Sequence, residues 1–148
     1  MTHASPEGIR APHVVHGVGI DLVDVEEIEE SLAAFGERYV RRVYTRSEAG
    51  TPWAGRAPPR VVRRLAFLFA VKEATLKALA HDRAGVDWRC IEVSAAGSSV
   101  VDVALSGDLA EVAARNGIVK FVGSVDARRT PVLAVVFALA VDFPRSTG

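Results

Sequence analysis

The chain has 148 residues, of which 49% are hydrophobic and 24% charged, so it is long enough to fold as one domain around its own hydrophobic core. Its formal net charge at pH 7 is zero, so no overall field attracts it to nucleic acid or to a membrane surface. A single cysteine, Cys90, excludes an internal disulfide and a cysteine-based metal cluster, and we expect a cytoplasmic, reducing compartment.

The beginning of the chain predicts one strand followed by one helix. The valine- and isoleucine-rich segment 13–23 is typical of a strand. Asp24 follows it, and Glu27 comes three residues later, which is the spacing of a helix capping box. Apolar residues then recur at helical spacing, so a helix is predicted over about 25–35. A second, short helix is expected near 45–49.

The middle of the chain predicts a loop and then one long, apolar helix. Three prolines and two glycines mark 50–60 as the loop. The next segment, 61–80, is predicted to be a helix, and every residue from Leu65 to Val71 is apolar. A helix that is apolar nearly all round is a buried helix. We therefore expect it to lie against a sheet or another subunit.

The second half of the chain changes to the two-residue period of strands. Residues 88–94 and 99–105 alternate in polarity and are predicted to form a hairpin around Gly97. A helix is predicted over 106–117, with Ser106 as a possible cap and Asn116-Gly117 as its end. The remaining predicted strands are 118–126 and 131–141.

These elements predict the fold class α+β, with a mainly antiparallel sheet packed on one long helix. Residues 1–12 are expected to be a flexible leader, and 13–148 a single domain. The leader lacks the apolar core of a signal peptide, and the apolar run 132–141 is too short to cross a bilayer. We therefore expect neither a membrane nor a nucleic acid among the partners.

Charged residues interrupt the apolar helix at Lys72, Glu73 and Lys77. Glu73 and Lys77 are four residues apart and share a face, whereas Lys72 lies about 100° from Glu73 around the helix. The pair could be a simple helix-surface contact worth roughly 0.2–0.5 kcal/mol. Asp21 offers another interpretation, because a carboxylate from a strand end, a glutamate and a lysine can together hold Mg²⁺ and a phosphate. The spacing alone leaves both interpretations open.

Four segments occur in a specific order along the chain. They are GVGIDLVDVEEI, which contains Asp21; TRSE; FAVKEATLKAL, which contains Glu73 and Lys77; and WRCIEV. This combination resembles the holo-acyl-carrier-protein synthase family of small, trimeric 4′-phosphopantetheinyl transferases, over about residues 14–142.

The resemblance implies a 4′-phosphopantetheinyl transferase-like fold and a Mg²⁺-dependent enzyme of fatty acid or polyketide metabolism. Such an enzyme moves the 4′-phosphopantetheine group of coenzyme A to a serine of an acyl carrier protein. The resemblance also implies that Asp21 and Glu73 bind Mg²⁺, and that Lys77 faces the phosphates and assists proton transfer. Lys72 corresponds to the family lysine beside the metal glutamate, among the coenzyme-binding residues. A homotrimer with active sites between subunits is expected.

The chain departs from the family pattern around the coenzyme site. The arginine that the family carries five residues before the glutamate is Leu68 here, and Arg64, one turn earlier, is the candidate replacement. The glycine turn that follows the helix in the family reads HDRAGV. Asp126 stands where the family has a histidine, and an aspartate repels phosphate unless it is paired or binds metal.

The first predicted helix also differs from the family pattern. In the family it carries arginines that meet an acidic helix of the carrier protein, whereas here it carries Glu26, Glu27, Glu29 and Glu30. Like charges across an interface disfavour encounter, although Arg38, Arg41 and Arg42 could take over part of the docking. The alternative function is a repurposed or non-catalytic family member that has lost coenzyme A transfer and uses the cleft for another small molecule or a carrier-bound chain. A structural protein without a site is the third interpretation.

Overall fold

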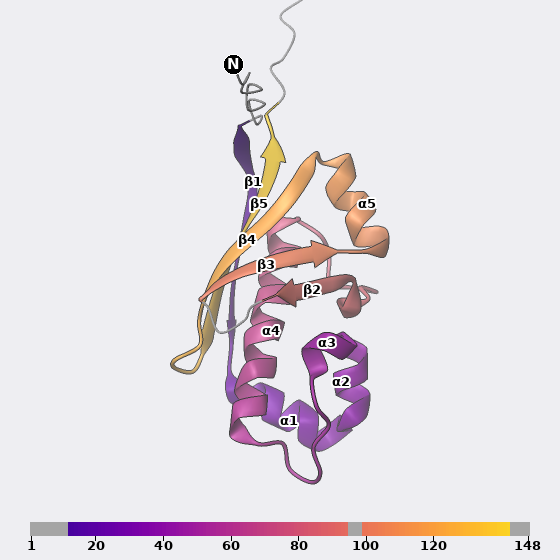
Figure 1. Cartoon of the computed structure of the whole chain (residues 1–148), viewed down its shortest axis with the longest axis vertical. Helices are drawn as coiled ribbons and strands as arrows, with labels where there is room; N and C mark the ends of the chain where they lie inside the picture. Colours follow the sequence, from indigo (N-terminus) through magenta and orange to yellow (C-terminus); the bar gives the residue numbers. More distant parts are fainter. Residues whose placement is uncertain (1–11, 95–98, 143–148) are drawn as a thin grey trace, which may run out of the picture.

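The fold is a five-stranded antiparallel sheet with a long helix against one of its faces (Figure 1). The computed structural model describes residues 12–94 and 99–142. The strand order is β1-β5-β4-β3-β2, so the first and last strands along the chain are neighbours. The strands are β1 (His13–Val23), β2 (Ile91–Ser94), β3 (Val100–Leu105), β4 (Ile118–Asp126) and β5 (Val132–Val141). The helices are α1 (Val25–Phe35), α2 (Glu37–Val43), α3 (Arg46–Ala49), α4 (Pro59–Ala78) and α5 (Gly107–Arg115).

Most elements lie where the sequence predicts them, and the α+β class with its antiparallel sheet on one long helix is confirmed. Helix α4 begins and ends two residues earlier than the predicted 61–80. The predicted hairpin is formed by β2 and β3, although residues 88–90 form a 3-10 turn instead of strand. The predicted turn at Gly97 lies outside the described residues.

Helix α2 is the element that the sequence analysis misses. Gly36 separates it from α1 with a φ of 53°, and the Gly36 N–H donates to the Leu32 carbonyl. A positive φ of this size favours glycine, so the chain turns here without strain. Only Val40 and Val43 of α2 are buried, and two apolar positions are too few to show a helical period.

The predicted capping box at the start of α1 is wrong. The Asp24 side chain makes no capping hydrogen bond to the helix. Thr130, from the turn between β4 and β5, takes that role: its Oγ1 accepts a hydrogen bond from the Val25 N–H at 3.3 Å and donates to the Asp24 carboxylate at 3.2 Å. A cap supplied by a distant residue leaves no local sequence signal.

Two glycines bring β1 unusually close to α4. A Cβ atom at Gly17 would overlap the carbonyl oxygen of Ala78, and one at Gly19 would overlap that of Ala74. Glycine is therefore required at both positions for the strand to lie directly on the helix. Because side chains alternate along a strand, Asp21 is directed to the same side as these glycines. The GVGID segment thus positions a carboxylate at the crossing of β1 and α4.

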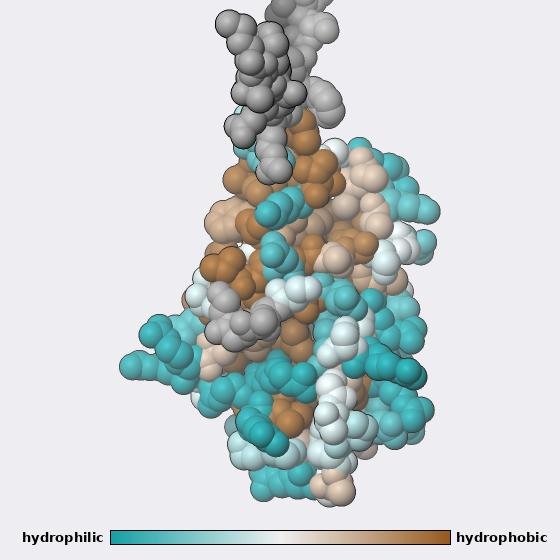
Figure 2. Space-filling view, in the orientation of Figure 1, coloured by the Kyte–Doolittle hydropathy of each residue, from teal (hydrophilic) through white to brown (hydrophobic). Residues whose placement is uncertain are grey.

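The opposite face of the sheet is apolar and exposed. Side chains directed away from α4 keep large exposed fractions: Ile20 54%, Leu22 60%, Leu133 38% and Phe137 37%. Figure 2 shows hydrophobic side chains gathered over β1, β5 and β4 on this face. We call the set of Val18, Ile20, Leu22, Leu133 and Phe137 the outer sheet patch. Among residues 12–94 and 99–142, no helix is long and apolar enough to cross a membrane.

Candidate functional site

Asp21 and Lys77 meet where β1 crosses α4. The Lys77 Nζ lies 2.6 Å from Asp21 Oδ1 and also donates to the Ile20 carbonyl at 3.0 Å. The Asp21 side chain is 14% exposed and the Lys77 side chain 51% exposed, so the lysine reaches the carboxylate from the solvent side. Strand and helix are far apart in sequence, and the glycine contacts hold them at this distance.

Glu73 lies one turn before Lys77 on α4 and pairs with Arg83. The Glu73 Oε1 is 2.7 Å from Arg83 Nη2, and the Glu73 side chain is only 4% exposed. The Arg83 guanidinium also lies over the Trp88 ring, 5.8 Å from its centroid. Burial raises the pKa of the Glu73 carboxyl, the positive charge of Arg83 opposes this shift, and the negative charge of Asp21 adds to it. The two carboxylates therefore lie near enough to interact electrostatically.

The structure thus brings together Asp21, Glu73 and Lys77, and adds Arg83 to them. Within the described residues, no group of three or more His, Cys, Asp or Glu side chains could form a complete protein cage for a metal. Mg²⁺ needs no such cage, since it is often held by one or two carboxylates, with waters and substrate phosphates as its other ligands. The donor set of two carboxylates therefore fits Mg²⁺ bound together with a phosphate substrate.

Lys72 is not part of this group. Its side chain is completely buried, and its Nζ lies 2.7 Å from Glu48 Oε2. It also donates to the backbone carbonyls of Trp88 at 2.9 Å and Ile91 at 2.6 Å. An ammonium group has three donors, and these partners use all of them. Burial lowers the pKa of Lys72, and Glu48 opposes that shift.

Glu48 is the buried partner that the sequence analysis does not single out. It is 4% exposed and accepts hydrogen bonds from the backbone N–H groups of Thr45, at 2.9 Å, and Val93, at 2.8 Å. Together with the Lys72 ion pair, these contacts join α3, α4 and β2. The signal was present in TRSE, because threonine followed three residues later by glutamate is the capping-box pattern, and α3 has that capping box.

Arg64 and Leu68 lie one turn apart on α4 beside a small cavity. The Arg64 Nη1 donates to the Glu48 carbonyl and its Nη2 to the Ala49 carbonyl, both at 2.7 Å, so the guanidinium covers the end of α3. Leu68 is buried at 6% exposure. A cavity of about 270 Å³ is lined by both residues. The other residues that line it are Ser47, Glu48, Phe67, Glu92, Val93 and Ser94.

Asp126 is neutralised by its own turn. Its carboxylate accepts hydrogen bonds from the backbone N–H, Nε and Nη2 of Arg128, at 3.1, 3.0 and 2.9 Å. These bonds hold the pKa of Asp126 at about 2. The condition under which an aspartate can lie near a phosphate, pairing with a cation, is therefore met.

The end of α4 has the left-handed geometry that glycine usually provides, although this chain lacks the family's glycine turn. Ala80 has a φ of 53°, its N–H donates to the Lys77 carbonyl, and the His81 N–H donates to the Leu76 carbonyl. These two bonds define a Schellman motif, in which the left-handed residue is usually glycine. The chain thus retains the left-handed helix end, with an alanine in place of glycine.

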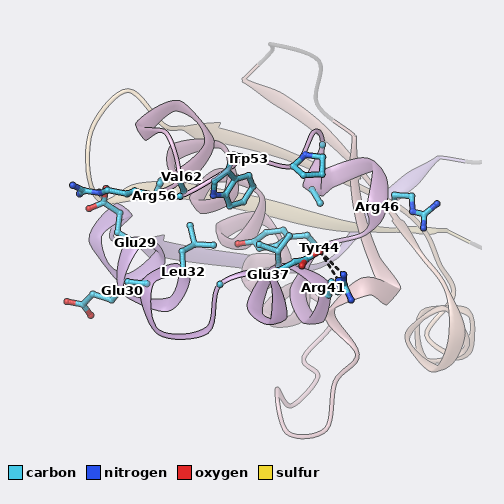
Figure 3. Close-up of a pocket in the computed structure, with 18 of the residues that line it drawn as sticks. Glu29, Glu30, Leu32, Glu37, Arg41, Tyr44, Arg46, Trp53, Arg56 and Val62 are labelled. Atoms are coloured by element: carbon cyan, nitrogen blue, oxygen red, sulfur yellow. Dashed lines mark hydrogen bonds and ion pairs between the residues drawn. The ribbon is translucent and has the colours of Figure 1, made fainter.

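A much larger cavity lies between α1, α2 and the loop that precedes α4 (Figure 3). Its volume is about 1340 Å³. Leu32, Val40, Trp53 and Val62 form apolar parts of its wall, and charged side chains surround them, including the ion pairs Glu37–Arg41 and Glu29–Arg56. None of Asp21, Glu73 and Lys77 lines this cavity.

The sequence and the fold can be compared with those of known proteins. The sequence model of the 4′-phosphopantetheinyl transferase superfamily matches residues 17–136. A holo-[acyl-carrier-protein] synthase of Paramagnetospirillum magneticum is 42% identical over 104 residues, which cover 69% of this chain and 76% of that protein. The chain therefore belongs to the 4′-phosphopantetheinyl transferase superfamily and, within it, to the holo-acyl-carrier-protein synthase family.

Solved structures show the same fold. The holo-acyl-carrier-protein synthase of Plasmodium yoelii has a TM-score of 0.75 and 23% identity, covering 88% of this chain and 99% of its own. The Helicobacter pylori enzyme, solved in complex with coenzyme A, has a TM-score of 0.64 and 24% identity, covering 84% of this chain and 99% of its own.

Proposed function

We propose that this protein transfers the 4′-phosphopantetheine group of coenzyme A to a serine hydroxyl of an acyl carrier protein. The reaction is Mg²⁺-dependent and serves fatty acid or polyketide metabolism. The observation that carries the proposal is the meeting of Asp21 and Glu73 with two cations at the crossing of β1 and α4, in a chain of this family. The coenzyme A complex of the Helicobacter pylori relative supports the choice of substrate.

Each residue of the site has a proposed role. Asp21 and Glu73 would hold Mg²⁺, which supplies neutralisation of the diphosphate charge when it is bound. Lys77 is held beside Asp21 with half of its side chain exposed, so its ammonium group can also contact a phosphate oxygen and assist the proton movement at the serine. The serine oxygen forms a bond to the phosphorus next to pantetheine, and the bond from that phosphorus to the bridging oxygen of the diphosphate breaks. 3′,5′-ADP leaves with the bridging oxygen, and the serine proton is released to water.

The other two predicted coenzyme-binding residues, Lys72 and Arg64, have different proposed roles. Because all donors of Lys72 are engaged, we assign it a structural role that holds α4 against β2, in place of a phosphate contact. Arg64 lines the cavity beside Leu68, where the family arginine is missing, so we propose that it supplies the positive charge at that position.

We propose that the active protein is a homotrimer with active sites between subunits. The support is the outer sheet patch, since contiguous exposed apolar surface on a folded protein marks an interaction site.

We also propose that the protein is cytoplasmic. The single cysteine, Cys90, is unpaired, which agrees with a reducing compartment.

The carrier protein would dock beside α1 and α2. Helix α1 presents acidic side chains, so it cannot attract an acidic recognition helix. On α2, Arg38, Arg41 and Arg42 are all exposed, but the charge of Arg41 is already paired with Glu37. We propose these two arginines as the contacts for the carrier, with correspondingly fewer charges than the family usually provides.

Two observations favour the alternative function. Asp21 and Glu73 are each already neutralised by a cation, and the family arginine is replaced by Leu68. A family member that has lost coenzyme A transfer could bind another small molecule or a carrier-bound chain in the same cleft.

Intact-mass spectrometry separates the two functions. Several apo carrier proteins are incubated with this protein, coenzyme A and Mg²⁺, with a standard enzyme of the family in parallel. We expect a mass gain of one phosphopantetheine on at least one carrier, and none with Glu73→Ala. No gain on any carrier that the standard enzyme modifies would reject the transferase function.

A further inference from the structure

Arg83 is a cation that the family motifs do not supply. It lies in the HDRAGV turn that follows α4, where the family has glycines, and it contacts Glu73 from outside the helix. The Arg83 side chain is 65% exposed, whereas the carboxylate that it neutralises is 4% exposed. The Arg83 guanidinium therefore binds Glu73 while most of its side chain remains exposed to solvent.

We propose that Arg83 is a phosphate-binding residue of this site, and that it exchanges partners when the site is loaded. In the free protein it neutralises Glu73. When Mg²⁺ occupies Asp21 and Glu73, Arg83 leaves the carboxylate and binds the diphosphate of coenzyme A. This inference rests on the proposed function and adds to Arg64 a second arginine that the family motifs do not supply.

The charge balance of the loaded site suits a diphosphate. In the free protein, the two carboxylates are balanced by Lys77 and Arg83, so the group of four has no net charge. Addition of Mg²⁺ gives this group a net charge of two, which matches the two negative charges of a diphosphate diester. Mg²⁺ competes with Arg83 for the Glu73 carboxylate, because each positive charge weakens the attraction of the other. The guanidinium is suited to phosphate, because its planar fork matches two phosphate oxygens.

Trp88 keeps Arg83 near the site during the exchange. The guanidinium lies over the indole ring at 5.8 Å, and this contact does not involve the metal-binding oxygens. Trp88 in turn packs against Phe69 of α4, with ring centroids 5.4 Å apart. The arginine can therefore turn from Glu73 toward a bound phosphate while its guanidinium remains beside the ring. Movement of Arg83 then changes the surroundings of Trp88.

Two titrations test the exchange on the intact protein. Calorimetry measures Mg²⁺ binding to the free protein, and coenzyme A binding in saturating Mg²⁺. For Arg83→Ala we expect Mg²⁺ to bind about fivefold more tightly, because its competitor is gone, and coenzyme A to bind about tenfold more weakly. Arg83→Lys keeps the charge but loses the fork, so it should restore Mg²⁺ affinity to the wild-type value and coenzyme A affinity only in part.

Arg115→Ala is the matched control. Arg115 belongs to an ion pair with Glu111 on α5 and has a similar exposure, 68%. Removing this charge should change neither titration. Fluorescence gives a direct measure of movement: Trp53→Phe leaves Trp88 as the single tryptophan, and Mg²⁺ should change its emission with Arg83 present but not in the Arg83→Ala background.

The outcomes distinguish this inference from the proposed function. Equal coenzyme A affinity of the wild-type protein and of Arg83→Ala would overturn the inference and leave the transferase function standing. A variant that loses affinity for both ligands would show that Arg83 only supports the fold, and would overturn it as well. Wild-type protein that binds no coenzyme A in Mg²⁺ would reject the proposed function and the phosphate contact together.

Discussion

Ala80 adopts a left-handed backbone conformation that is energetically unfavourable for a residue with a side chain. It ends α4 in the left-handed region, with a φ of 53°, and directly precedes the turn that carries Arg83. A residue with a Cβ atom is disfavoured there by roughly 1–2 kcal/mol relative to glycine. The strain lies within a few residues of Lys77 and Arg83, so it is stored at the edge of the proposed active site.

We predict that Ala80→Gly stabilises the protein by about 1 kcal/mol, because glycine adopts this conformation without strain. Gly117 provides the opposite control, since it has a φ of 68° and open space where a Cβ would be. Gly117→Ala should destabilise by about the same amount. Urea unfolding curves measure both, and equal stability of Ala80→Gly and wild type would show that the turn is not strained.

The buried Tyr44 hydroxyl makes the stability of the fold depend on pH in the alkaline range. Its hydroxyl donates to the Leu65 carbonyl at 3.0 Å, and burial raises its pKa well above the ordinary value of 10.0. The unfolded chain loses this proton near pH 10 while the folded protein keeps it. Stability is therefore complete below pH 10 and falls as the pH rises toward the folded pKa. Tyr39 shifts in the same direction.

We predict that Tyr44→Phe destabilises the protein by about 1 kcal/mol at neutral pH, because the Leu65 carbonyl loses its donor. The same variant should lose less stability than wild type between pH 9 and pH 11. Urea midpoints over this range give the comparison, and parallel pH profiles for the two proteins would contradict the assignment to Tyr44.

At the scale of elements, the Glu48–Lys72 pair joins three segments that the sequence separates. The pair is buried on both sides, at 2% and 0% side-chain exposure, and it links α3 and β2 to the middle of α4. Removing one member of a buried pair costs about 3–5 kcal/mol, because the other charge is left without a partner.

We predict that Lys72→Met costs about 3 kcal/mol, and that the double variant Glu48→Gln/Lys72→Met recovers part of the loss. A double-mutant cycle from urea unfolding measures the coupling between the two residues. Coenzyme A affinity of the folded double variant should equal that of wild type. A large loss of that affinity would return Lys72 to the coenzyme-binding residues.

The sequence predicts these elements unequally, for physical reasons. Helix α4 and strand β5 are recognised because their buried apolar residues extend over many positions, and β1 because it is rich in valine and isoleucine. Helix α2 escapes recognition because it is short, and the start of α1 is misread because its cap comes from Thr130. Local spacing places Glu73 and Lys77 on one face, but only the tertiary structure shows that Lys72 turns away and that Arg83 comes in.

At the scale of the whole molecule, the outer sheet patch is the feature that a single chain does not explain. Side chains of β1 and β5 that lie opposite each other in register, such as Val18 with Phe137 and Leu22 with Leu133, remain exposed on this face. The proposed trimer would cover them, and it would bring the edge of β1, which carries Asp21, close to a neighbouring subunit.

We predict that Phe137→Lys converts the trimer into monomers, because a charge in a buried apolar contact cannot be solvated. Phe35→Lys is the matched control, since Phe35 is 60% exposed at the end of α1 and outside the patch. Light scattering after size-exclusion chromatography measures the mass. Monomeric wild-type protein at micromolar concentration would contradict the trimer and the interfacial site.

The pairing of β1 with β5 sets the time at which the proposed site can form during synthesis. Every pairing partner of β1 in the described sheet lies between Val132 and Val141. On the ribosome, the strand that carries Asp21 therefore has no partner strand until nearly all of the described fold has been translated. A nascent chain can already contain Asp21, Glu73 and Lys77 and still lack the sheet that holds them together. The proposed site therefore reaches its final geometry only after β5 has been translated.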